Sequence, residues 1–63
     1  MHPLVRQVRM YAVEVGKKHP QHGRAIDDVL RIMDEEIARG SPMQHEIAMA
    51  YGDLDYLMAL RVV

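Results

Sequence analysis

Residues 37–44 read Ile-Ala-Arg-Gly-Ser-Pro-Met-Gln, and this stretch decides the fold because it separates two segments with helical periodicity. Gly40 can adopt the left-handed conformation that closes a helix. Ser41 suits the N-cap of the next helix, with Pro42 at its first position and Gln44 completing a capping box. Because helices joined by so short a turn pack side by side in opposite directions, we expect an antiparallel helical hairpin.

The segments on both sides of this turn carry apolar residues at helical spacing. Residues 24–39 present one narrow apolar stripe, and their opposite face offers two ion pairs four residues apart, Asp27 with Arg31 and Glu35 with Arg39. Residues 42–61 present a main stripe of Met43, Ile47, Ala50, Tyr51, Leu54, Leu57 and Met58. Each segment is therefore expected to form one amphipathic helix.

The N-terminal third of the chain has the same pattern. Residues 3–18 place Leu4, Val5, Val8, Tyr11, Ala12 and Val15 on one face. Pro20 interrupts the pattern, because the residue before a proline avoids the helical region, so residues 19–23 are expected to form a loop. The fold class is thus all-α: one domain over residues 1–63 with three helices (3–18, 24–39 and 42–61), a turn at 40–41, and the last two helices in a hairpin.

The last helix carries more apolar faces than its own chain can cover. A second stripe of Met49, Tyr56 and Leu60 lies nearly opposite the first, and a line of small residues runs between the two. Large apolar side chains on a second face indicate a partner, and small residues allow two helices to approach closely. We expect a homodimeric helical bundle whose interface is formed by Ala48, Met49, Gly52, Tyr56, Ala59 and Leu60.

The size of the chain supports the same expectation. A chain of 7.3 kDa buries about 6,400 Å² on folding. If somewhat more than half of that area is apolar, burial contributes about 90 kcal/mol. Ordering 63 residues costs about 95 kcal/mol. The chain has no cysteine, so neither a disulfide nor a thiolate-bound metal can add stability. Self-association or a bound partner is therefore the expected source of additional stability.

The net charge of −1 conceals an uneven distribution. Residues 1–24 hold five cations against one acid, a net charge of +4, and residues 25–63 hold three cations against eight acids, a net charge of −5. The simpler interpretation is attraction between the two parts, within the fold or across a dimer. The other is a pair of binding surfaces of opposite sign.

The acidic part leads to a functional hypothesis, a non-catalytic protein–protein interaction module acting as a small regulatory inhibitor or adaptor. Its partner would be a basic protein, such as the DNA-binding face of a regulator. Tyrosines anchor many interfaces, and charges set encounter rate and partner choice. The expected contact residues are Asp34, Glu35, Tyr51, Asp53, Asp55 and Tyr56, with Glu46 on the same negative surface. If the dimer covers the whole second stripe, the partner surface moves to residues 24–39 and the basic strip of residues 3–18.

The alternative is a dimeric nucleic-acid-binding protein. Arg6, Arg9, Lys17 and Lys18 would follow phosphates along the first helix, although the chain as a whole is not basic. In style, a short, helical, cysteine-free chain with more Arg than Lys is similar to small accessory proteins of bacteria and their phages.

Other functions find little support in the sequence. His19 and His22 flank Pro20 without further ligands at metal-binding spacing, and after His45-Glu46 a zinc protease would need a ligand where Met49 stands. No paired carboxylates or phosphate loop indicate an enzyme, so we expect no catalytic residue, metal or cofactor. No apolar run approaches membrane-spanning length, and we expect a cytoplasmic protein without membrane contact.

Overall fold

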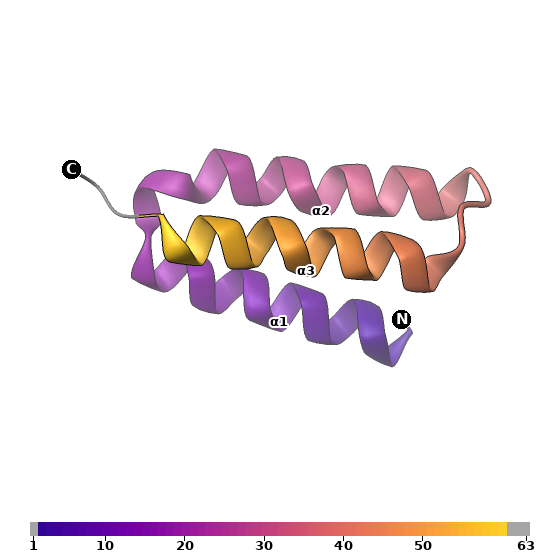
Figure 1. Ribbon diagram of the computed structural model, residues 1–63, viewed down its shortest axis with the longest axis horizontal. Coiled ribbons are helices and arrows are strands. Elements are labelled where there is room, and N and C mark those ends of the chain that lie inside the picture. The colour runs from indigo at the N-terminus through magenta and orange to yellow at the C-terminus, as the bar shows by residue number, and fades with distance from the viewer. Residues whose placement is uncertain (1, 61–63) are drawn as a thin grey trace.

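The computed structural model describes residues 2–60 and confirms the all-α fold class. Three α-helices follow one another, α1 (Pro3–Lys18), α2 (Gly23–Ala38) and α3 (Met43–Ala59), with a short 3-10 turn η1 (Pro20–His22) before α2. No strand occurs within residues 2–60. The helices lie along one another in an elongated bundle of 39 × 17 × 16 Å (Figure 1).

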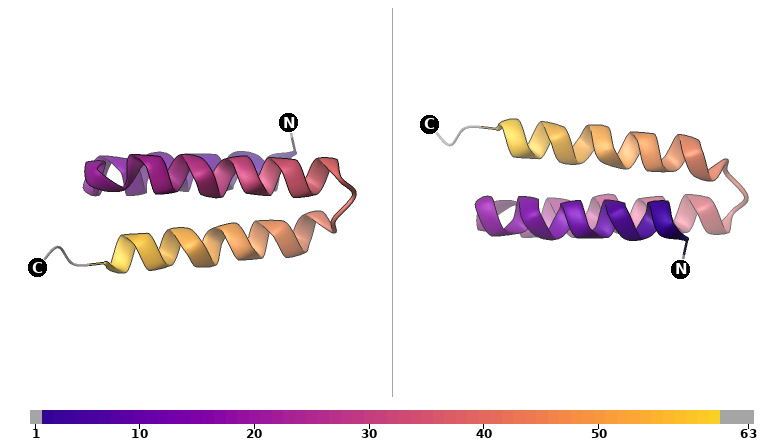
Figure 2. Two further views of the ribbon diagram at one scale, coloured as in Figure 1. Left: turned by 90° about the horizontal axis from the view of Figure 1, so that it is seen from above. Right: turned by 90° about the horizontal axis from the view of Figure 1, so that it is seen from below.

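The helices form a triangle in which α3 covers the seam between the other two. In Figure 1, α3 lies between α2 and α1, and in Figure 2 it stands to one side of the α1–α2 pair. Figure 1 also shows that α1 and α3 run in the same direction and that α2 runs in the opposite direction. Consecutive helices are therefore antiparallel, as the short connections require.

The start of α1 and the break after it follow from local chemistry. The imidazole Nδ1 of His2 accepts a hydrogen bond from the backbone N–H of Leu4 at 3.2 Å, and Pro3 occupies the first turn, where no N–H is needed. Lys17 and Lys18 lie in the last turn, where the negative end of the helix dipole stabilises positive side chains. Residues 20–22 form a 3-10 turn rather than an irregular loop, and α2 begins at Gly23.

The turn between α2 and α3 is a Schellman motif, and the expected cap at Ser41 is wrong. Gly40 has a φ of 101°, as the closing position requires. The N–H of Gly40 donates to Ile37 O at 3.1 Å, and the N–H of Ser41 donates to Glu36 O at 3.0 Å. Ser41 therefore completes the end of α2, and the extended Pro42 is the N-cap of α3, with no side-chain capping bond.

The core lies where the three helices meet. Val8, Val15 and Leu54 are fully buried, and buried side chains from α2, including Ile26 and Met33, pack in the same cluster. α1 and α3 contribute four residues each to this cluster, and α3 contacts both of its neighbours. Its helical part ends at Ala59, two residues before the expected end, because Leu60 is extended. Arg61, at that expected end, lies outside the described residues.

Candidate protein interaction surfaces

One exposed surface without charged residues is the side of α3 that faces away from α1 and α2. We call it the outer face of α3, and it consists of His45, Ala48, Met49, Gly52, Tyr56 and Ala59, all exposed. The side chains of Met49 and Tyr56 are 53% and 66% exposed. None of these six residues is an acid, a lysine or an arginine. The surface expected to form the dimer interface is thus uncovered in the single chain.

Leu60 does not belong to this surface. The prediction placed Leu60 on the second stripe because the helix was expected to continue to residue 61. The extended conformation of Leu60 turns its side chain back to the bundle, where it is half-buried against the core cluster. Five of the six expected interface residues therefore remain on the exposed side of α3.

Tyr51 and Asp55 lie at the contact between α3 and α1. The rings of Tyr11 and Tyr51 pack with their centroids 5.7 Å apart, and the Tyr11 hydroxyl donates a hydrogen bond to Asp55 Oδ1 at 2.5 Å. This hydrogen bond raises the pKa of Tyr11 above its ordinary value, with further contributions from desolvation and from the charge of Asp55. Tyr51 is half-buried, so one part of its side chain packs in the contact between α3 and α1 and another part remains exposed to solvent.

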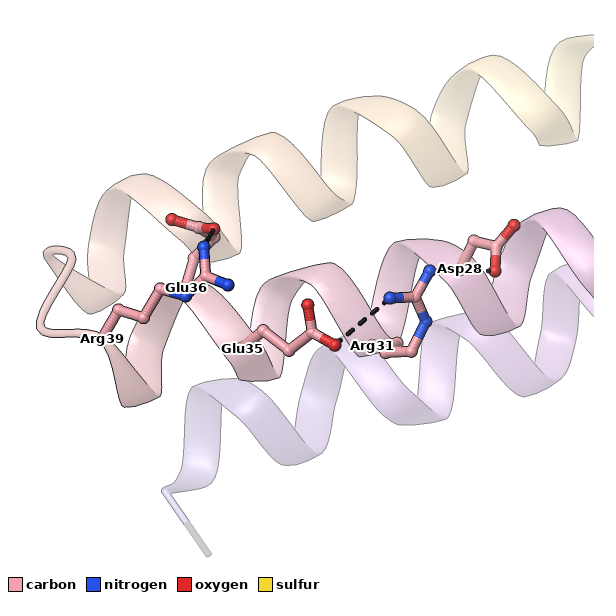
Figure 3. Close-up of polar contacts among 5 residues, drawn as sticks. All are labelled: Asp28, Arg31, Glu35, Glu36 and Arg39. Atoms are coloured by element: carbon pink, nitrogen blue, oxygen red, sulfur yellow. Dashed lines mark hydrogen bonds and ion pairs between the residues drawn. The ribbon is translucent and has the colours of Figure 1, made fainter.

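Four of the five acidic residues of α2 form ion pairs, and those within the helix have partners that differ from the expected ones. Arg31 contacts Glu35 at 3.2 Å and Asp28 at 3.4 Å, rather than Asp27. Arg39 contacts Glu36 at 3.2 Å, rather than Glu35 (Figure 3). The two hydrogen bonds that Arg31 donates raise its pKa above the ordinary value, the one to Glu35 more than the one to Asp28.

Asp34 points the other way and forms an ion pair with Arg9 of α1. Every member of the run Asp34-Glu35-Glu36 thus has a cationic partner within the chain. The pair between Arg9 and Asp34 also confirms, for these two residues, that the basic and acidic parts of the sequence attract each other within the fold.

The residues expected to contact a basic partner do not form one surface. Tyr51 and Asp55 lie on the α1 side of α3, whereas Tyr56 follows Tyr51 by about 140° around the helix and lies on the outer face. Asp53 is exposed on a third side of α3. Asp34 and Glu35 belong to α2, in separate ion pairs. The structure places them around the bundle rather than in one patch.

Glu46, also expected on the negative surface, is buried. Only 8% of it is exposed, and it lines a small cavity of about 30 Å³ between α2 and α3 with Val29, Met33 and Ala50. It lies in the first turn of α3, where the helix dipole favours a negative charge. Glu46 lies four residues before Ala50, which belongs to the main apolar stripe, and this spacing was the sequence signal that it would point inwards.

The basic strip of α1 is divided by the ion pair of Arg9. Arg6 and Lys17 are exposed on the side of α1 that also carries Met10 and Val13, which are 62% and 56% exposed. Lys17 lies 3.8 Å from Glu14, and Arg9 is held by Asp34. Lys18 is exposed further round the helix. On the side of α1 that Arg6 and Lys17 share, Arg6 is therefore the expected phosphate contact that has no ion pair within residues 2–60.

A groove between α1 and α2 was not anticipated from the sequence. It has a volume of about 340 Å³ and is lined by residues of these two helices alone. Helical periodicity identifies which residues face inwards, but it does not reveal where two helices leave a gap.

Two of the histidines lie next to each other at η1. His19 and His22 lie with ring centroids 5.6 Å apart, and Nε2 of His22 is buried without a hydrogen-bond partner. Within residues 2–60, no three His, Asp or Glu side chains gather closely enough to hold a metal ion. None of the described helices combines the length and apolar character needed to cross a membrane.

Comparison with known proteins gives no relative from which a role could be transferred. No protein-family model matches the chain, and no curated protein or solved structure matches it either.

Proposed function

We propose that this protein is a non-catalytic interaction module that pairs with a second copy of itself through the outer face of α3. The observation that carries this proposal is the exposure of Tyr56 and Met49 on a face without charged residues. Large apolar groups grouped on one helix face favour an interface over scattered surface residues.

The order of residues on this face suits an antiparallel pair. With Gly52 at the two-fold axis, the residue four positions after it meets the residue four positions before it in the other copy, so Tyr56 lies against Ala48. Similarly, Ala59 lies against His45. A large side chain thus faces a small one on both sides of the axis, which is the self-complementarity that a two-fold interface needs. Addition of a Cβ at Gly52 would meet nothing within 4 Å, so the centre is open to the second helix.

In this proposal, the dimer acts as a small regulatory adaptor or inhibitor that binds another protein. Asp53 and Asp55 flank the outer face and would edge the paired helices with carboxylates from both copies. Tyr51 lies beside Asp55 on the same side. These residues are the proposed contacts for a basic partner, while Asp34 and Glu35 would contribute only by exchanging their present ion pairs.

A second candidate is nucleic-acid binding through α1. The observation in its favour is the exposure of Arg6 and Lys17 with Met10 and Val13 on the same helix. It receives less support because Arg9 already pairs with Asp34, and acids of α2 lie across the helix contact.

The self-association is tested by the molecular mass in solution. Sedimentation equilibrium of the unmodified chain at micromolar concentration should give twice the 7.3 kDa chain mass. Ala48→Arg and Gly52→Arg should give monomers, because each places a charge in the interface. Ala38→Arg, an exposed alanine in α2, is the matched control and should remain dimeric. A monomeric unmodified chain, or variants that stay dimeric, would overturn the proposal. Circular dichroism shows whether each variant keeps its helices.

A further inference from the structure

The groove between α1 and α2 is an apolar surface on the side of these helices that α3 does not cover. Its floor consists of small residues, Ala12, Gly16 and Gly23, and its walls include Val13, Ile26 and Leu30. The two charged residues that line it are Arg9 and Asp27. A four-helix bundle would fill such a groove with its fourth helix.

The groove exists because the floor residues have little or no side chain. A Cβ at Gly16 would lie 3.8 Å from Ile26 Cδ1, and a Cβ at Gly23 would meet nothing within 4 Å. From Arg9 to Gly16 the groove follows α1 for about 10 Å, at about 1.5 Å per residue. This length corresponds to about two turns of an added helix.

The faces that border the groove carry a positive charge. Residues three, four or seven positions from a lining residue share its side of a helix. On this rule α1 contributes Arg6, Arg9 and Lys17, and α2 contributes Arg24, Arg31, Asp27 and Asp34. Three of these five cations are in ion pairs, so the charges that remain unpaired beside the groove within residues 2–60 are Arg6 and Arg24 against Asp27, a net charge of +1. Arg9 and Asp34 neutralise each other. Lys17 and Arg31 also contact acids that lie further round their helices, whereas Arg6 and Arg24 have no ion pair within residues 2–60.

From this combination we infer that the α1–α2 groove docks an acidic amphipathic helix of a partner protein. The occupant lays two turns of apolar side chains on the small floor residues and directs Asp and Glu side chains to Arg6, Lys17 and Arg24. Helices bind apolar grooves in this manner through residues at i, i+3, i+4 and i+7. A nucleic acid fits less well, because phosphates would leave the apolar floor uncovered. The inference rests on the proposed role as an interaction module but uses the side of the bundle opposite to the outer face of α3.

The probe is a synthetic amphipathic peptide of about 18 residues, long enough to form a helix in isolation. It carries Leu and Ala on one stripe and Glu on both flanks, and its twin carries Lys in place of every Glu. Fluorescence anisotropy should show saturable binding of the acidic peptide, at least about tenfold tighter than binding of the Lys twin. Equal binding of both peptides, or no binding of the acidic one, would overturn the inference.

Variants locate the binding. Gly16→Leu fills the groove with a side chain of the chain itself, and Arg24→Glu reverses one free cation at its edge. Each should weaken the acidic peptide at least about tenfold. Lys18→Glu makes the same charge change away from the groove and should leave affinity within about twofold. If Lys18→Glu weakens binding as much as Arg24→Glu, attraction is unspecific and the inference fails. If a random DNA duplex binds and Gly16→Leu does not weaken it, the basic side serves a nucleic acid and the inference fails as well.

The same samples separate this inference from the proposed pairing. Ala48→Arg should lose self-association but bind the acidic peptide with unchanged affinity. A monomeric unmodified chain that still binds the peptide overturns the pairing alone. A dimer that does not bind it overturns the groove alone.

Discussion

Arg9 of α1 and Asp34 of α2 form the ion pair that joins the basic part of the chain to its acidic part. The two residues are 25 positions apart in the sequence and meet where α1 and α2 run antiparallel. Nε of Arg9 is enclosed without a partner, so the guanidinium is held by one of its edges only. The pair links these two helices next to the groove.

Asp34→Asn should lower the free energy of unfolding by about 1 kcal/mol or less, because more than a third of each side chain is exposed and solvent screens the pair. Urea denaturation should show that this loss shrinks as salt is added. Glu14→Gln is the control, since its carboxylate lies 3.8 Å from Lys17 and both side chains are more exposed. A loss that salt leaves unchanged would contradict an electrostatic origin.

Tyr11 should ionise at a higher pH than an ordinary tyrosine, because the hydrogen bond to Asp55 raises its pKa. Since the folded-state pKa lies above the unfolded value of about 10, the stabilisation from this group is complete below pH about 10. It is lost as the pH rises through the folded-state pKa. Titration of phenolate absorbance should show that Asp55→Asn lowers the pKa of Tyr11 towards its ordinary value. Asp53→Asn, which removes an acid that makes no contact with Tyr11, should not do so.

Leu54→Ala should cost about 2–5 kcal/mol, because Leu54 is fully buried at the meeting point of the helices. In so small a domain this is a large share of the total stability, so the variant should be substantially unfolded in the absence of denaturant. Ile32→Ala, at a residue that is half exposed, should change stability by no more than about 0.5 kcal/mol. Thermal unfolding followed by circular dichroism compares the two, and similar losses would mean that the core is not where the structure places it.

Gly40→Ala should destabilise the protein by about 1–2 kcal/mol, because its φ of 101° is unfavourable for a residue with a Cβ. Gly16→Ala should have the opposite sign and gain about 0.5–1 kcal/mol, since Gly16 is helical and the new Cβ meets Ile26 at an ordinary distance. Urea midpoints of the two variants should therefore lie on opposite sides of the parent value. A stabilising Gly40→Ala would rule out the left-handed turn.

The three helices could be predicted from the sequence because Pro20, Gly40 and Pro42 interrupt an apolar period that is otherwise regular. The N-cap of α3 could not be predicted, because Ser41 suits two roles: here its N–H completes the Schellman turn of α2, and Pro42 takes the N-cap position of α3. The ion-pair partners of Arg31 could not be predicted from the sequence either. Periodicity places several acids within reach of one guanidinium, and rotamers decide among them.

The candidate surfaces were predictable only where they depend on one helix. The outer face of α3 follows from the spacing within α3, except at Leu60, where the helix has already ended. The groove depends on the separation of α1 and α2, which the packing of α3 on both of them sets. The dispersal of Tyr51, Tyr56 and Asp34 likewise follows from three-dimensional placement, whereas the sequence showed only that acids and tyrosines share the C-terminal part.

The parallel course of α1 and α3 has a practical consequence. α1 starts at the end of the bundle that holds the α2–α3 turn, and α3 finishes at the opposite end, near η1 (Figure 1). If two copies pair with their α3 helices antiparallel, the finish of one α3 lies at the same end as the start of the other copy's α1. Two copies could then be fused in tandem through a flexible linker. Such a single polypeptide would keep the two α3 helices together at dilutions where separate chains come apart.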